Sequence, residues 1–88
     1  MANHKSALKE HRQSVKRRLR LRTHRSRMRT AVKNLRRAVE AGDAEAARGL
    51  LPTTLAAVDR TAKLGAIHDN AAARTKSRLT RALNKLGS

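Results

Sequence analysis

Glycine and proline are absent from the first 41 residues of this chain, so nothing in that stretch breaks a long helix. We predict one helix from about Ser6 to Ala41, with Ser6 as its N-cap and Gly42 closing it. At 1.5 Å per residue, such a helix is roughly 50–55 Å long. A helix of this length, with the short turns that follow, restricts the fold to an elongated helical assembly.

The same stretch carries an unusual density of positive charge. Its first forty residues hold fourteen Lys and Arg against Glu10 and Glu40, which gives +12 of the chain's total of +16. Like charges three and four residues apart destabilise a helix. A helix this positive therefore requires an extended anionic partner, and a phosphodiester backbone has the appropriate charge density.

Two shorter helices are predicted in the remainder of the chain, at residues 43–64 and 69–86. Asp43 is placed to cap the first of them, and Gly65 ends it. Pro52 lies inside it and is expected either to kink it or to divide it into two short helices. His68, Asp69 and Asn70 precede the last helix, and any of them is a possible cap. Because the connections are short, we predict an all-α, antiparallel three-helix bundle with an extended, highly basic first helix.

Apolar residues divide the first helix into two parts. Met28, Val32, Leu35 and Val39 form a regular stripe that indicates a bundle helix. Upstream the stripe thins to Leu8, Val15 and Leu19, and Leu21 is taken to be out of phase with it. We therefore expect a single domain over residues 1–88, in which 1–27 form a basic arm continuous with the bundle part, 28–41. In the other helices we expect a core of Leu51, Leu55, Val58, Ala62, Ala72, Leu79, Ala82, Leu83 and Leu86.

Charge also differs between the predicted helices. Residues 41–64 have no net charge, whereas residues 65–88 carry +4. The middle helix is therefore expected on the solvent side, and the first and third on the side that binds nucleic acid.

Several classes of function lack the residues they need. Cysteine is absent, which excludes disulfides, thiol catalysis and cysteine-bound zinc. The six acidic residues form no paired motif and there is no Gly-rich phosphate loop, so we predict no enzyme, no cofactor and no small-molecule substrate. His4, His11 and His24 lie among cations, which opposes a metal site. For His68, a capping role and direct phosphate contact both stay open. No apolar run is long enough to span a membrane.

The type of nucleic acid follows from what the basic arm lacks. No aromatic residue is present to stack on bases, and no heptads follow the basic region as in a leucine-zipper dimer. A helix that is basic on every face suits insertion between the helices of a folded RNA. Three alternatives are a nucleoid-type DNA-binding protein, a helix lying on a membrane surface and a mitochondrial presequence.

Four segments of the chain resemble one family in order and spacing. These are Met1 to Ala7 (MANHKSA), Arg25 to Lys33 (RSRMRTAVK), the turn Ala41-Gly42-Asp43, and Ala62 to Leu79 (AKLGAIHDNAAARTKSRL). Together they are similar to the bacterial small-subunit ribosomal protein S-twenty family, and the similarity covers the whole chain.

The resemblance implies a structural constituent of the small ribosomal subunit that binds small-subunit rRNA near the bottom of the particle. Such a protein is cytoplasmic and ribosome-bound, and needs few or no protein contacts. By position, the resemblance assigns RNA contact to Asn3, Lys5, Ser6, Lys9, Arg12, Lys16, Arg17, Arg25, Ser26, Arg29, Thr30, His68, Asn70, Arg74, Lys76, Ser77 and Arg78. The charge density of the first helix adds Arg18, Arg20, Arg22 and Lys33. We expect the arm to neutralise phosphates between packed RNA helices, with the third helix as a second contact surface.

Overall fold

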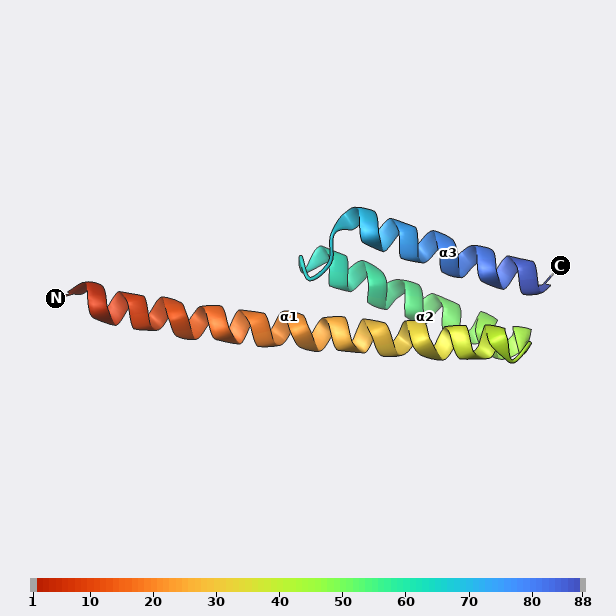
Figure 1. The fold of residues 1–88 in the computed structure, drawn as a ribbon, viewed down its shortest axis with the longest axis horizontal. Helices are drawn as coiled ribbons and strands as arrows, with labels where there is room; N and C mark the ends of the chain where they lie inside the picture. Colours follow the sequence, from red (N-terminus) through yellow and green to blue (C-terminus); the bar gives the residue numbers. More distant parts are fainter. Residues whose placement is uncertain (1, 88) are drawn as a thin grey trace.

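The computed structural model describes residues 2–87, with side chains for residues 5–86. It contains three helices, α1 (Ala2–Glu40), α2 (Ala44–Lys63) and α3 (Asp69–Gly87), and no strand within the described residues (Figure 1). The predicted all-α three-helix bundle with a long first helix is confirmed.

The three helices lie side by side along one direction. α2 runs antiparallel to α1, and α3 runs antiparallel to α2 and therefore parallel to α1 (Figure 1). α2 packs against both of the others, whereas α1 and α3 contact each other least. The molecule measures 67 × 20 × 15 Å because the N-terminal part of α1 extends beyond the bundle.

Both turns are closed by a glycine in the left-handed region. Gly42 has φ 75° and Gly65 has φ 79°, a conformation that favours glycine over residues with a Cβ. After α1, the Asp43 N–H donates to the Ala38 carbonyl at 3.0 Å, as expected for a Schellman turn. The Asp43 side chain then accepts the Ala46 N–H at 3.1 Å, which confirms its predicted role as the cap of α2.

The expected start of the first helix is wrong. α1 already begins at Ala2, so Ser6 lies inside the helix and does not cap it. A serine early in a helical stretch is ambiguous, because its side chain is compatible with the first turns as well as with the cap.

The core is small and aliphatic. Leu35, Ala47, Leu79 and Leu83 form one buried cluster to which each helix contributes, and Val32, Ala38, Val39 and Leu51 pack against it. Val58 and Ala72 are also buried. The predicted stripes of α1 and α3 therefore supply core residues.

Two threonines complete the core on α2. Thr54 and Thr61 are each only 2% exposed, and their hydroxyls donate to the carbonyls of Leu50 and Ala57 at 2.8 and 2.7 Å. Each hydroxyl thus satisfies its hydrogen bond within its own helix, so that the methyl group can pack in the interior. The most buried face of α2 consists of Ala47, Thr54, Val58 and Thr61, whereas the predicted Leu51, Leu55 and Ala62 are half-buried at its sides.

Pro52 does not divide α2. The helix is continuous from Ala44 to Lys63, and Pro52 is exposed. Proline lacks the N–H that would pair with the Arg48 carbonyl. The packing of Ala47 and Thr54 on either side holds the helix together across that missing bond.

The expected continuation of the apolar stripe into the arm is also wrong. Leu21 is half-buried, and it stands seven residues before Met28, so it belongs to the face that contacts the bundle. Leu8, Val15 and Leu19 are exposed instead. At 100° per residue, Leu19 lies about 180° around the helix from Met28, so the apolar stripe of the arm faces away from the bundle.

Candidate nucleic-acid interface

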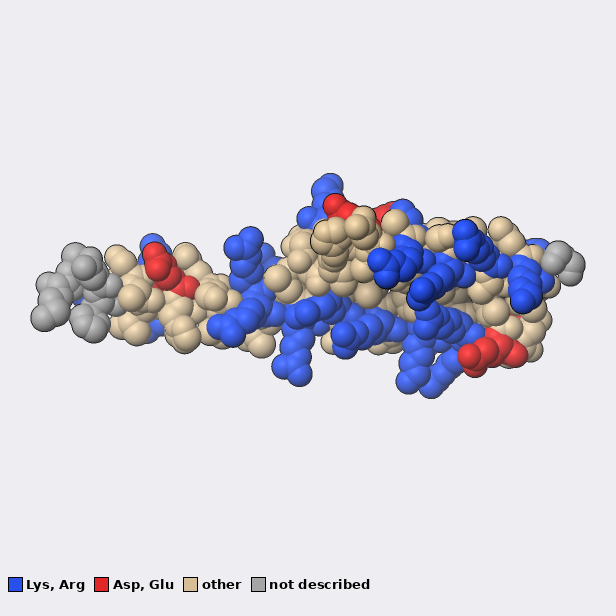
Figure 2. Space-filling view, turned by 45° about the horizontal axis from the view of Figure 1, so that its top comes forward, with Lys and Arg blue, Asp and Glu red and all other residues tan. Residues whose placement is uncertain are grey.

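The positive side chains of α1 are all exposed. Each of its fourteen Lys and Arg has an exposed side chain, and among the described residues none of them forms an ion pair. Figure 2 shows these cations gathered over α1 and the neighbouring part of α3, with acidic side chains toward the edges of that face. This face is therefore strongly positive and is not neutralised by the protein itself.

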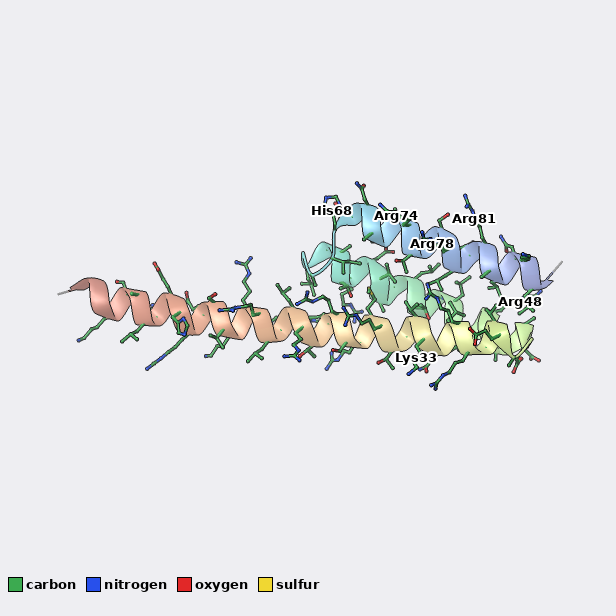
Figure 3. The ribbon with its side chains drawn as sticks, in the orientation of Figure 1. Lys33, Arg48, His68, Arg74, Arg78 and Arg81 are labelled. Carbon is green, nitrogen blue, oxygen red and sulfur yellow. The ribbon has the colours of Figure 1, made fainter. Side chains whose placement is uncertain are left out.

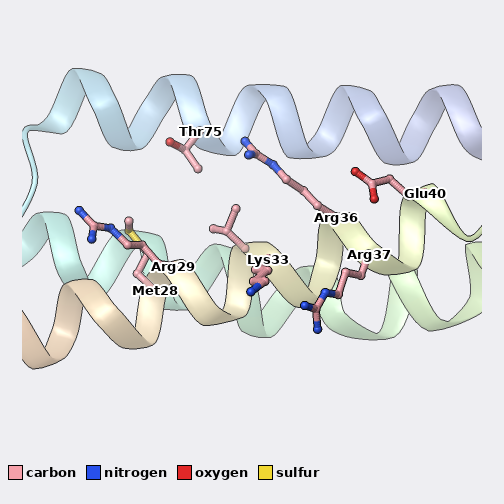
Figure 4. Close-up of a pocket in the computed structure, with 8 residues that line it drawn as sticks. Met28, Arg29, Lys33, Arg36, Arg37, Glu40 and Thr75 are labelled. Atoms are coloured by element: carbon pink, nitrogen blue, oxygen red, sulfur yellow. The ribbon is translucent and has the colours of Figure 1, made fainter.

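A groove lies where α1 and α3 approach each other. It encloses about 460 Å³ and has Met28 and Val32 on its apolar side, with Thr75 reaching in from α3 (Figure 4). Four α1 cations and one acid complete its lining: Arg29, Lys33, Arg36, Arg37 and Glu40. The groove exists because α2 holds α1 and α3 together while these two pack only weakly against each other.

A second hollow adjoins the groove toward the C-terminal end of α1. It encloses about 240 Å³ and shares Arg36 and Glu40 with the first. Arg78 of α3 lines it, above an apolar surface of Val39, Leu79 and Ala82. In Figure 4 the Arg36 side chain extends from α1 toward α3, so its guanidinium lies between the two helices.

α3 contributes its own row of cations. Arg74, Arg78 and Arg81 are four and three residues apart, which places them on one face of the helix (Figure 3). All three are exposed. Of these, Arg78 lines the second hollow together with Arg36 of α1. Guanidinium groups from two helices beside an apolar hollow form a surface suited to bidentate binding of phosphates, with the hollow accepting sugar or base.

The structure brings only some of the predicted contact residues to this groove. Arg29 and Lys33 line it, and Arg78 lines the second hollow that adjoins it. Arg74 is exposed on α3. Ser77 is exposed on α3. The exposed arm residues extend away from the groove along α1, and they are Lys5, Ser6, Lys9, Arg12, Lys16, Arg17, Arg18, Arg20, Arg22, Arg25 and Ser26. Asn3 lies outside the residues whose side chains are described.

Two further predicted residues have their hydrogen-bonding groups engaged. The Thr30 hydroxyl donates to the Ser26 carbonyl at 3.0 Å. The ammonium of Lys76 contacts a carboxylate oxygen of Asp59 at 2.7 Å, which joins α3 to α2. Lys76 is half-buried by this pairing, so it is directed toward α2 and not toward the groove.

His68 caps α3. Its Nδ1 accepts the Asn70 N–H at 3.0 Å, and its carbonyl accepts the Ala72 N–H at the same distance. Of the two readings left open by the sequence, the structure provides the geometry for capping, and the Nε2 edge of the ring is left for other contacts. Figure 1 shows this turn above the middle of α1, where the arm leaves the bundle.

Arg36, Arg37, Thr75 and Arg81 were not among the predicted contact residues. A signal for Arg36 was present, because Arg29, Lys33 and Arg36 are spaced four and three residues apart and so share a helix face. Thr75 has no comparable signal, since its place in the groove depends on how α3 packs beside α1.

Across the described residues, no three His, Asp or Glu side chains come together as a metal site would require. No described helix combines the length and apolar character needed to cross a membrane.

The chain is similar to known proteins over nearly its whole length. The sequence profile described as "Ribosomal protein S20" matches residues 2–84. This chain belongs to the ribosomal protein S20 family.

The relatives support this membership at nearly full length. The protein named "Small ribosomal subunit protein bS20" from Maridesulfovibrio salexigens is 51% identical over 98% of this chain and 99% of its own. Proteins of the same name from Pelobacter propionicus and Geobacter metallireducens are 46% and 47% identical over 99% of this chain and their whole lengths. The resemblance of the four sequence segments to the S20 family is thereby confirmed.

Proposed function

We propose that this protein is a structural component of the small ribosomal subunit and binds small-subunit rRNA directly through α1 and α3. The observation that carries the proposal is the set of exposed, unpaired cations of α1, which continues into the groove facing α3. Membership of the S20 family supports the same assignment. The protein would accordingly be found in the cytoplasm, on the ribosome, without a cofactor or small-molecule substrate.

The proposed mechanism is electrostatic. Each phosphate that pairs with an arginine releases a condensed counterion, and this release supplies much of the binding free energy. Where two RNA helices pack closely, their phosphates repel, and a rod of cations between them lowers that repulsion. The bundle fixes the direction of α1, so the cations are presented as a rigid row.

We assign different roles to the two parts of the interface. The α1–α3 groove holds Arg29, Lys33 and Arg36, and the adjoining hollow adds Arg78, in a fixed arrangement because both helices are packed on α2. The arm, from Lys5 to about Arg20, adds charge along its length and is exposed throughout. We therefore infer that the groove sets the position on the RNA, with help from Arg74, Ser77 and the His68–Asn70 turn, and that the arm adds affinity.

No catalytic role is proposed. A structural ribosomal protein needs binding surfaces and no reactive group, and the role assigned here uses only charge, shape and hydrogen bonding.

Salt-dependent binding to transcribed small-subunit rRNA tests the proposal. With six to ten phosphates contacted, affinity should fall roughly 10³–10⁵-fold between 50 and 200 mM salt. Arg29→Gln and Arg36→Gln should each weaken binding and reduce the salt slope by about one. Arg48→Gln, an exposed α2 residue away from the groove (Figure 3), is the matched control and should leave the slope unchanged.

Competition with duplex DNA distinguishes this function from a DNA-binding one. Folded rRNA should be displaced poorly by an equal mass of duplex DNA. Efficient displacement, or an affinity that does not respond to salt, would contradict the proposal.

A further inference from the structure

The arm of α1 carries an apolar stripe that none of the described residues covers. Leu8, Val15 and Leu19 are 57%, 37% and 57% exposed. They are seven and four residues apart, so they lie on one face of the helix. The face of α1 that contacts the bundle contains Leu21 and Met28, about 180° around the helix from Leu19. The stripe of the arm is therefore turned away from the bundle.

Cations border this stripe along both edges. Taking 100° per residue, Arg12 and Lys16 lie to one side of the line joining Leu8, Val15 and Leu19, and Arg18 and Arg22 lie to the other. All four cations are exposed, and none of them is paired with an acid in the described structure. The arm therefore presents a narrow apolar ridge between two rows of cations. The distance between the two rows is the width of a helix, ~10 Å.

We propose that this ridge docks in the minor groove of an A-form RNA duplex, with the apolar side chains against ribose and base edges. This inference rests on the proposed rRNA binding and specifies how the arm takes part in it. The minor groove of A-form RNA is wide and shallow and displays the sugars, so a convex helix can approach it closely. The two cationic rows then face the phosphates of the two strands that border the groove.

The other surfaces of nucleic acids fit the ridge less well. The major groove of A-form RNA is deep and narrow, and the minor groove of B-DNA is only about 6 Å wide. Single-stranded RNA is usually held by aromatic stacking, and this chain has no Phe, Tyr or Trp.

Two other classes of partner are disfavoured by the charges at the edges. A protein partner would have to desolvate or pair the cations on both sides of the ridge, which is costly. A membrane surface binds helices with a broad apolar face, often with Trp or Phe, whereas this ridge is one side chain wide.

The ridge is continuous with the proposed interface. Ser26 and Lys33 stand seven and fourteen residues after Leu19, so they continue the same face of α1, and Lys33 lines the α1–α3 groove. One RNA duplex lying along this face would therefore contact apolar residues at the arm and cations near the bundle.

Substitution of the ridge gives the first test. The triple variant Leu8→Gln, Val15→Gln, Leu19→Gln keeps every charge, and Leu50→Gln with Leu64→Gln is the control, because these leucines of α2 and the following turn are 38% and 44% exposed. The triple variant should bind small-subunit rRNA roughly 10–100-fold more weakly, given the apolar area involved. Its salt slope should equal that of the unmodified protein, because no phosphate contact is lost.

The outcomes separate this inference from the proposed function. If the unmodified protein binds rRNA and the triple variant binds equally well, the ridge inference is wrong and the proposed function stands. If the unmodified protein does not bind rRNA, the proposed function itself fails. If the triple variant still binds rRNA but no longer binds phosphatidylglycerol vesicles, which the unmodified protein binds, the partner of the ridge is a membrane. If the triple variant still binds rRNA but no longer assembles into small subunits in the presence of the other ribosomal proteins, the partner of the ridge is a protein. Either result overturns the inference.

A local probe gives the second test. Because the chain has no cysteine, His11→Cys places a single thiol at the edge of the ridge, three residues after Leu8 and four before Val15. An iron chelate attached there should cut riboses in both strands bordering one minor groove of the bound rRNA. The control is Ala56→Cys on the exposed side of α2, which should give a different pattern. Cuts confined to single-stranded rRNA, or no cuts from position 11, would refute the docking geometry.

Discussion

Leu35 is the residue whose truncation should most damage the bundle. Its side chain has no exposed area, and it is clustered with Ala47 of α2 and with Leu79 and Leu83 of α3. Leu→Ala at such sites costs about 2–5 kcal/mol, through lost burial and the remaining cavity. At about 0.05–0.15 kcal/mol per residue, a chain of 88 residues has roughly 4–13 kcal/mol of stability in total, so Leu35→Ala should remove a large fraction of it.

Thermal and urea unfolding followed by circular dichroism measure this loss. The expected decrease in Tm is roughly 8–40 °C, at 4–8 °C per kcal/mol for a domain of this length. Leu50→Ala is the matched control, since Leu50 is 38% exposed, and it should cost less than about 1 kcal/mol. If the folded bundle sets the position on the RNA, as proposed, excess rRNA should restore part of the lost stability. If both variants unfold at the same urea concentration, the core described above is not what stabilises the fold.

Three further predictions concern the helices individually. Pro52→Ala should raise the free energy of unfolding by about 1–3 kcal/mol, because alanine supplies an N–H for the Arg48 carbonyl in an otherwise continuous helix; an unchanged urea midpoint would contradict this. In the free protein, amides of residues 8–20 should exchange with solvent faster than those of residues 30–40, because only the latter are packed in the bundle; equal protection in both segments would argue against an unsupported arm. Asp59→Asn should release Lys76 at a cost below about 1 kcal/mol and steepen the salt dependence of rRNA binding by about one phosphate contact; an unaltered slope would show that the freed ammonium does not reach RNA.

The fold was largely predictable because its main signals are local. The absence of glycine and proline before Gly42, and the cap at Asp43, follow from backbone chemistry that acts within a few residues. The helical stripe through Met28 and Leu35 likewise identifies the face that is buried, whatever its partner.

Other features depend on packing that no local signal encodes. Thr54 and Thr61 have polar side chains, yet they can be buried because their hydroxyls donate hydrogen bonds within the helix. The phase of Leu19 was misassigned because a helix with cations on every face offers no polar side for comparison. The pairing of Lys76 with Asp59 spans 17 residues and requires α2 and α3 to be in register. The motif assigned Lys76 to RNA contact, which stays a prediction, and gave no sign that its side chain also joins two helices.

The continuity of α1 has a mechanical consequence. The helix passes from the core cluster at Leu35 to the end of the arm without a glycine, a proline or a break. No hinge separates the part of α1 that is packed in the bundle from the exposed arm. A small rotation of the bundle on the RNA would therefore become a larger displacement at the N-terminal end of the arm. Correct seating of the bundle therefore aims the arm, and a slight error in that seating would swing the tip away from its target.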